Sequence, residues 1–198
     1  SSLLHGTGTI DHAAGRSLIG SGTVYGNHRF RGLVSPGNDL VPIGTVAGSN
    51  VNRFELAATS TLHIDIASVS SFDQLKQIEM FSMAGTLELN PLPSYTPVLG
   101  DAITFTNNSH PDGKFDRLVA PPLADPNWRW RIRYGLGSVA AVVICAADFD
   151  ANDFVTGDDF DLFIQAFSNG DDSADFNNDG FVTTDDFDTF SEAFQAGC

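Results

Sequence analysis

Residues 148–159 and 175–186, two acidic stretches near the C-terminus, carry the residue types best suited to binding a metal ion. In each twelve-residue stretch, side chains with oxygen atoms occupy positions 1, 3, 5 and 12, an aliphatic residue position 8 and a threonine position 9. Calcium is a hard cation that takes about six to eight oxygen ligands. A loop of this length can wrap one ion with early side chains, the carbonyl at position 7 and a late carboxylate. The sequence therefore predicts two bound Ca²⁺ ions.

The two stretches belong to a longer internal repeat. Residues 148–170 align without gaps on residues 175–197, and 13 of the 23 aligned positions are identical. Each stretch is followed by phenylalanines spaced as on one face of an amphipathic helix. A disordered acidic tail is the alternative, but disordered segments are poor in aromatic residues, and ten of the sixteen phenylalanines lie here. We expect two helices whose phenylalanines form a small core: Phe160, Phe163, Phe167, Phe187, Phe190 and Phe194.

This pattern resembles the dockerin modules, which contain two EF-hand-like loops. Asp159 and Asp186 stand at position 12, as in dockerins, where a standard EF-hand has Glu. The spacing between the copies is also too short for a full helix before the second loop. The resemblance implies one ligand set of Asp148, Asp150, Asn152, the Phe154 carbonyl, Thr156 and Asp159, and a second set of Asp175, Asn177, Asp179, the Phe181 carbonyl, Thr183 and Asp186.

Position 6 distinguishes the two loops. This position needs a left-handed backbone, which Gly180 supplies in the second loop, whereas Asp153 stands there in the first. Asp tolerates that conformation at a cost of about 1 kcal/mol. We therefore expect the first site to bind calcium more weakly than the second.

The resemblance also implies a protein partner. Dockerins bind a cohesin-type β domain through loop positions 10 and 11, which here are Gly157 and Asp158 in the first copy and Thr184 and Asp185 in the second. These differ from the Ser-Thr pair of many cellulosomal dockerins, so a standard cellulosomal partner is not expected. The alternative is a module that only stabilises the C-terminal end of the chain.

The net charge of −15 is concentrated in the same region. Residues 146–198 hold 14 of the 25 acidic residues and no Lys or Arg, which leaves 11 acidic against 10 basic residues upstream. No basic patch is available to neutralise phosphates, so nucleic acid is not an expected partner. No apolar run approaches the roughly 20 residues that span a bilayer, so no transmembrane segment is expected.

Two cysteines, Cys145 and Cys198, bracket the acidic segment. In a secreted protein they would form a disulfide, and the chain-entropy model gives about 4 kcal/mol for a loop of this length. The alternative is two unrelated thiols. The sequence starts at Ser1 without a visible signal peptide, which suggests a processed or excised chain.

Residues 1–145 have the pattern of β structure. Apolar and polar residues alternate over 61–66, 86–89 and 130–134, residues 139–145 form a nearly continuous apolar run, and Gly, Pro and Asn separate the runs. Gly-Thr-aliphatic steps at residues 8–10 and 22–24 suit the rungs of a β-solenoid within residues 1–40. We expect a mainly β chain, with a β-sandwich or the end of a β-solenoid over 1–145 and a small α-helical EF-hand pair over 146–198.

Residues 54–145 also show a recurring order of strand and turn residues. These are Phe72 to Leu75, Gly85 to Leu89, Gly100 and Asp101 with Ile103 and Phe105, Gly113 with Phe115, and Trp130 with Tyr134. This order resembles a module near the C-terminal end of secreted, autotransporter-like β proteins. The resemblance implies an extracellular β domain and carries no catalytic residues.

Catalytic motifs are absent from the sequence, so we expect no enzyme. The histidines are not spaced as metal ligands. Asp65 and Glu88 could be the paired carboxylates of a glycosidase, but strands often carry outward acidic residues, so they are weak evidence for such a site. Trp128, Trp130 and Tyr134 can stack on a sugar but more often form packing contacts, so carbohydrate is a further candidate partner.

Together these features predict a non-catalytic, secreted structural protein, extracellular or at the cell surface. Its calcium-stabilised module would dock on other subunits, either copies of itself in a filament or a cohesin-like β domain. The alternative is the C-terminal anchoring or carbohydrate-binding part of a larger secreted protein that acts on polysaccharides.

Overall fold

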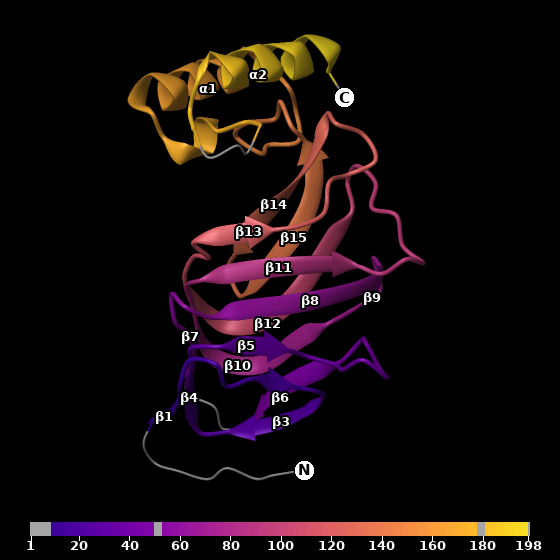
Figure 1. The fold of residues 1–198 in the computed structure, drawn as a ribbon, viewed down its shortest axis with the longest axis vertical. Coiled ribbons are helices and arrows are strands. Elements are labelled where there is room, and N and C mark those ends of the chain that lie inside the picture. Colours follow the sequence, from indigo (N-terminus) through magenta and orange to yellow (C-terminus); the bar gives the residue numbers. More distant parts are fainter. Residues whose placement is uncertain (1–8, 50–52, 178–180, 198) are drawn as a thin grey trace. The chain divides into compact units, whose positions relative to one another are not determined.

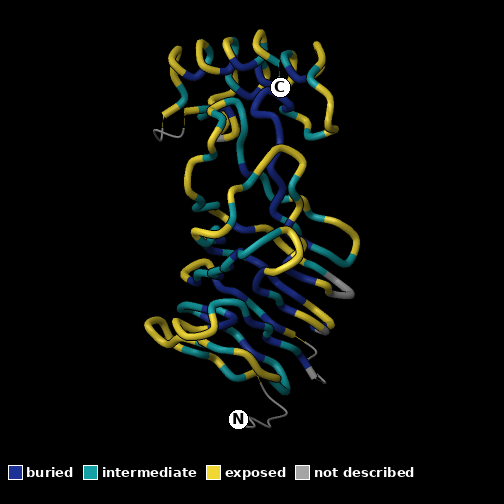
Figure 2. Tube along the Cα trace, turned by 90° about the vertical axis from the view of Figure 1, so that its right-hand side faces the viewer, coloured by how far each residue is buried: buried dark blue, intermediate teal, exposed yellow. Residues whose placement is uncertain are grey.

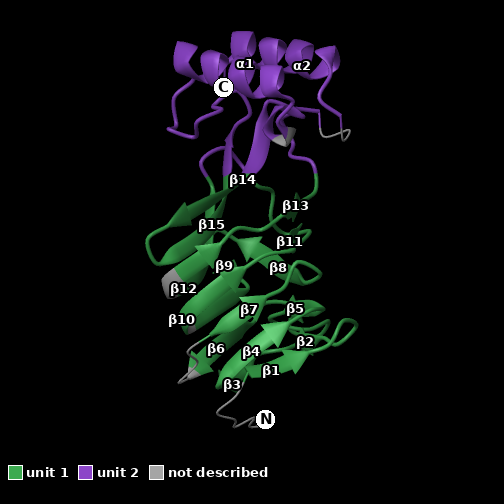
Figure 3. Ribbon diagram, turned by 90° about the vertical axis from the view of Figure 1, so that its left-hand side faces the viewer, with its two compact units in different colours: residues 1–97, 101–121, 131–142 green, residues 98–100, 122–130, 143–198 purple. Residues whose placement is uncertain are grey.

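The computed structural model describes residues 9–49, 53–177 and 181–197 and contains two compact units (Figure 3). The first comprises Ser1–Pro97, Asp101–Pro121 and Arg131–Val142, and the second comprises Val98–Gly100, Pro122–Trp130 and Val143–Cys198. Residues 146–198, which carry the acidic repeat, fall in the second unit together with three shorter pieces of chain.

The described part of the chain is mainly β, as the sequence predicts, and its helices follow the strands (Figure 1). The strands are β1 (Thr9–His12), β2 (Leu18–Ile19), β3 (Gly22–Tyr25), β4 (Asn27–Phe30), β5 (Leu33–Ser35), β6 (Thr45–Ser49), β7 (Phe54–Leu56), β8 (Thr61–Ser68), β9 (Ser71–Phe72), β10 (Gln74–Met83), β11 (Thr86–Pro91), β12 (Ala102–Gly113), β13 (Arg117–Val119), β14 (Trp128–Gly135) and β15 (Ser138–Cys145). The helices are α1 (Gly157–Asn169), the 3₁₀ helix η1 (Asp172–Ala174) and α2 (Thr184–Ala196).

Most strands of the first unit pair in parallel with strands one winding of the chain further on. One series runs β1–β4–β7–β10–β12, a second runs β2–β5–β8–β11–β13, and β3–β6–β10 forms a third. Parallel neighbours need a long connection between them, and here each connection contains the strands of the other series. Thr9 begins β1 and Gly22 begins β3, and these two strands belong to different series. The spacing of the Gly-Thr steps near the N-terminus is therefore not the length of one winding.

Alternating side chains fill the interior of these windings. In β8, Leu62, Ile64 and Ile66 are fully buried while the residues between them are only half-buried. Rings from successive windings also lie over one another, with centroid distances of 4.6 Å for Phe30 and Phe54 and 5.9 Å for Phe54 and Phe81. Figure 2 shows the result, with buried segments that recur from one winding of the chain to the next.

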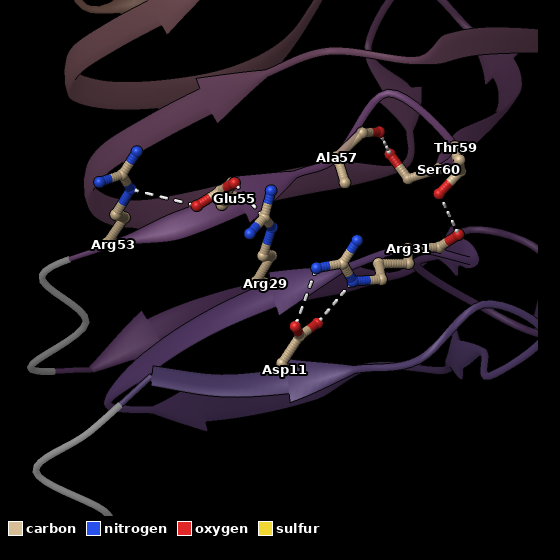
Figure 4. Close-up of polar contacts among 8 residues, drawn as sticks. All are labelled: Asp11, Arg29, Arg31, Arg53, Glu55, Ala57, Thr59 and Ser60. Atoms are coloured by element: carbon tan, nitrogen blue, oxygen red, sulfur yellow. Dashed lines mark hydrogen bonds and ion pairs between the residues drawn. The ribbon is translucent and has the colours of Figure 1, made fainter.

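Ion pairs link the outward side chains of β1, β4 and β7 (Figure 4). Arg31 donates two hydrogen bonds to Asp11, at 2.9 and 3.0 Å, and Arg29 lies 2.9 Å from Glu55. Arg53 approaches the second oxygen of Glu55 at 3.5 Å. Exposed pairs add little stability, but opposite charges on neighbouring strands favour this register over its alternatives.

One carboxyl group is enclosed within the first unit. The Asp73 side chain is fully buried and accepts backbone hydrogen bonds from Gly44, at 2.7 Å, and Asp65, at 3.1 Å. Burial raises the pKa of Asp73 to about 7, although the two N–H groups act in the opposite direction. Asp73 therefore ties β8 to the segment that leads into β6.

We predict that the first unit loses stability as the pH rises from about 4 through 7. The folded-state pKa of Asp73 lies above the unfolded value, so its contribution is complete below pH 4 and is lost as the pH passes the folded pKa. Amide hydrogen exchange in β8 and β11, corrected for intrinsic rates, measures this loss.

The matched control is Asp73→Asn, which cannot ionise and keeps one acceptor oxygen. Its protection should vary less with pH over this range. Identical pH dependence in the two proteins would contradict the role given to Asp73.

Candidate metal centre

Each acidic loop leads directly into a helix of the second unit, as the repeat predicts. Thr156 and Thr183 are the N-cap residues of α1 and α2, and each hydroxyl accepts a hydrogen bond from the backbone N–H two residues later. The aspartate three residues after each cap accepts a hydrogen bond from the cap's backbone N–H, at 2.8 Å in both copies, which completes a capping box. Loop positions 9 and 12 therefore also fix where each helix begins.

The first loop brings three carboxylates together. Oxygen atoms of Asp148, Asp150 and Asp159 lie within 4.8 Å of one another, and no other such group of His, Cys, Asp or Glu occurs in the described part of the chain. Asp148 and Asp159 are buried, whereas Asp150 is exposed. Two buried carboxylates and one exposed carboxylate form an open, oxygen-only arrangement that suits a hard cation.

Backbone N–H groups hold these carboxylates in place. Asp148 accepts hydrogen bonds from the N–H groups of Asn152 and Asp153, both at 3.0 Å. Asp159 accepts from Phe149 at 2.7 Å and from Asp150 at 3.1 Å. The loop is thus closed from position 12 back to positions 2 and 3.

Burial is the largest cause of the raised pKa of Asp148, and the nearby Asp159 carboxylate raises it further. Backbone hydrogen bonds from Asp153 and Asn152 act in the opposite direction. A bound divalent cation would favour the ionised form, because an opposite charge next to a carboxyl group stabilises its charged state.

The loop backbone adopts the conformation expected at position 6. Asp153 has a φ of 73°, in the left-handed region that a glycine would adopt more easily. Ala151 at position 4 has a φ of 61°, which the sequence analysis did not anticipate. The first loop therefore places two non-glycine residues in a conformation that L-residues disfavour.

The remaining predicted ligands of the first loop lie around the three carboxylates. The Asn152 side-chain amide donates to Asp150 at 2.9 Å, and its carbonyl oxygen accepts from the Phe154 N–H at 2.9 Å. The Phe154 side chain is 70% exposed, so any role in binding an ion falls to its backbone carbonyl. The Thr156 hydroxyl lies 3.4 Å from Asp159.

The second loop repeats the closing hydrogen bonds of the first. Asp186 is fully buried and accepts from the N–H groups of Phe176 at 2.7 Å and Asn177 at 3.0 Å. Burial opposes ionisation of Asp186, but backbone N–H groups of Asn177, Thr183 and Phe176 outweigh it, and the pKa is lowered. Asp175 and Phe181 lie in the described part of this loop, whereas Asp179 and Gly180 lie outside the described residues.

The phenylalanine stripes form the core of the second unit. Phe163 and Phe190 are fully buried and stack with centroids 3.9 Å apart and an interplanar angle of 8°. The other four phenylalanines of the two stripes pack against this pair. Arg129 also contacts this core, with its guanidinium 5.7 Å from the Phe149 ring centroid and 5.4 Å from that of Phe176. This contact was not predicted, because Arg129 lies far from both phenylalanines in the sequence.

The four predicted docking residues begin the two helices. Gly157 and Asp158 open α1, Thr184 and Asp185 open α2, and all four are exposed. They are therefore accessible on the surface of the second unit.

Cys145 is buried, and its predicted partner, Cys198, lies outside the described residues, so the disulfide stays a prediction.

The other candidate residues have structural contacts. Trp130 is buried, and the Tyr134 hydroxyl accepts a hydrogen bond from the Phe115 N–H at 3.0 Å. Asp65 and Glu88 each lie 3.1 Å from a different ring nitrogen of His63. No local pattern indicates that a histidine lies between these two carboxylates, because the pairing of β8 with β11 brings the three side chains together.

No known family model matches the chain, and no curated protein sequence matches it. Within the part of the chain that the structure describes, no helix is long and apolar enough to cross a membrane.

We predict that Asp159→Ala unfolds the start of α1, because it removes the acceptor for Phe149, Asp150 and Thr156. Loss of a capping interaction costs about 1 kcal/mol, and leaving buried N–H groups unpaired adds to this cost. Circular dichroism and amide exchange in α1 measure the effect. Asp161→Ala, an exposed acid two residues later on the same helix, is the matched control. Equal loss of helix in both variants would contradict a specific role for Asp159.

Proposed function

We propose that the second unit is a dockerin-type, EF-hand-like module that binds two Ca²⁺ ions. The observation that carries this proposal is the convergence of the Asp148, Asp150 and Asp159 carboxylates in the first loop. The matching hydrogen bonds around Asp159 and Asp186 extend it to the second copy. Each loop offers its ion the side chains at positions 1, 3, 5 and 12 and the carbonyl at position 7.

Electrostatics support this proposal as strongly as geometry. Residues 146–198 contain 14 acidic residues and no Lys or Arg. Carboxylates held close together repel one another unless a cation lies between them. Calcium binding therefore contributes to the folding free energy of the module, because the unfolded chain offers no preformed site.

The calcium proposal is tested by isothermal titration calorimetry of the chelator-treated protein. We expect two ions per chain and a higher unfolding temperature with calcium than with chelator. Asp148→Asn and Asp175→Asn should each abolish one site, because each replaces the first ligand of one loop.

Asp171→Asn, between the two loops and exposed, is the matched control and should keep both sites. A wild-type chain that takes up no calcium at millimolar concentration would overturn the proposal.

For the whole chain we propose a non-catalytic, extracellular structural role. The parallel register of successive windings supports assigning the first unit to the C-terminal end of a β-solenoid rather than to a sandwich. The exposed helix starts at Gly157, Asp158, Thr184 and Asp185 support docking on another subunit, either a further copy or a cohesin-like β domain. Calcium would hold these helix starts in place.

The docking proposal predicts calcium-dependent assembly. Light scattering of the purified chain should show a larger mass with calcium than with chelator, and Asp158→Lys combined with Asp185→Lys should reduce this mass. The control is Asp161→Lys combined with Asp188→Lys, which makes the same charge change at exposed positions further along the helices. Assemblies of equal mass with and without calcium would contradict the role of the module.

A further inference from the structure

The first unit contains a pocket of about 380 Å³ above β8 and β11. Its lining combines four apolar residues, Ile19, Leu33, Pro42 and Leu92, with six polar ones, Ser35, Asn38, Asp39, His63, Asp65 and Asn90. A concave site that combines apolar surface with convergent polar groups is a common form of small-ligand site.

The pairing of β8 with β11 brings several polar side chains together at the pocket. β8 and β11 are parallel, with His63 opposite Glu88 and Asp65 opposite Asn90. All four side chains point outward, because the residues between them, Leu62, Ile64, Leu87 and Leu89, are buried. The pocket floor is therefore fixed by two core strands and not by a loop.

A histidine lies between the two acids of this floor. His63 Nδ1 lies 3.1 Å from Glu88, and Nε2 lies 3.1 Å from Asp65 Oδ1. A neutral imidazole can donate from only one nitrogen, so two ionised carboxylates at these distances favour the imidazolium. The Asn90 amide also donates to Asp65 Oδ1, at 2.5 Å.

These contacts leave acceptor atoms on two residues of the pocket lining. The Asp65 carboxylate uses Oδ1 for both His63 and Asn90, and Asn90 uses its nitrogen, so Asp65 Oδ2 and the Asn90 carbonyl remain to accept hydrogen bonds from a ligand. The backbone at Asp65 is held by the buried Asp73, which also accepts a hydrogen bond from the N–H of Gly44, two residues after Pro42. Asp73 therefore connects two segments that contribute residues to the pocket lining.

The charge of the pocket selects the ligand. Asp39, Asp65 and the adjacent Glu88 outnumber the one basic side chain, His63, and the lining contains no Lys or Arg. An anionic ligand would be repelled. A metal ion lacks a preformed site, because within the described residues three metal-type ligands converge only in the acidic loop of the second unit.

We propose that this pocket binds a primary ammonium group carried on an aliphatic chain. The ammonium would donate to Asp65 Oδ2 and the Asn90 carbonyl, and its methylene groups would contact the apolar residues of the lining. Ile19, one of these residues, is 55% exposed and would be covered by such a ligand. The proposal concerns the first unit and does not depend on calcium binding by the second.

The test is an NMR titration of the calcium-loaded chain with n-butylammonium, with n-butanol as the uncharged control of equal length. We expect saturable shifts of the His63 and Asn90 side-chain signals with the amine alone. Asp65→Asn should weaken binding about tenfold or more, because the ammonium then bonds to a neutral amide oxygen and loses the opposite charge of the carboxylate. Asn90→Ala should also weaken it, so a second variant tests the site if the first is poorly folded.

Glu79→Gln is the matched control, because it removes one exposed acidic charge from β10, whose residues do not line the pocket. Its affinity should equal that of the wild type. Nα-acetyl-lysine methylamide and glucosamine then distinguish a protein side chain from an amino sugar as the source of the ammonium. Equal binding of n-butanol, unsaturable shifts, or unchanged affinity in both pocket variants would overturn the proposal, as would binding of glucose as tight as that of glucosamine.

Discussion

The second unit depends on carboxylates that are buried and bonded to backbone N–H groups. Asp159 and Asp186 are fully buried, and each accepts hydrogen bonds from the start of its own loop and from its helix cap. These contacts close each loop and set the first turn of each helix. The helices can then place Phe163 against Phe190. The same arrangement leaves negative charge concentrated at the start of the first loop, which a divalent cation would neutralise.

The first unit uses a different principle. Its strands repeat the same pairing from one winding to the next, so buried side chains stack on buried side chains and outward side chains line up on the surface. Such alignment produces both the ion pairs, Asp11 with Arg31 and Arg29 with Glu55, and the row of His63, Asp65, Glu88 and Asn90. A pocket floor can therefore arise from outward residues of neighbouring strands.

The sequence predicted the features that depend on neighbours along the chain. Alternation at residues 61–66 predicted a strand, and phenylalanine spacing after each loop predicted α1 and α2 with their buried faces. It also placed position 6 at Asp153, whose φ is 73°. These features follow from local periodicity and from the fixed length of a loop.

Contacts between distant segments were not predicted. The sequence left a sandwich and a solenoid open, because alternation is the same in both and only strand pairing distinguishes them. It did not reveal that Asp65 and Glu88 hold His63, that Asp73 is buried, or that Arg129 contacts two loop phenylalanines. Each of these contacts joins residues brought together by register or by a turn of the chain.

The most direct test of the account is a crystal structure of the chain grown with calcium, with anomalous difference density to locate the ions. The account predicts one peak among the oxygens of Asp148, Asp150 and Asp159 and a second among those of Asp175, Asn177 and Asp186. Ordered loops with no anomalous density at either place would contradict it.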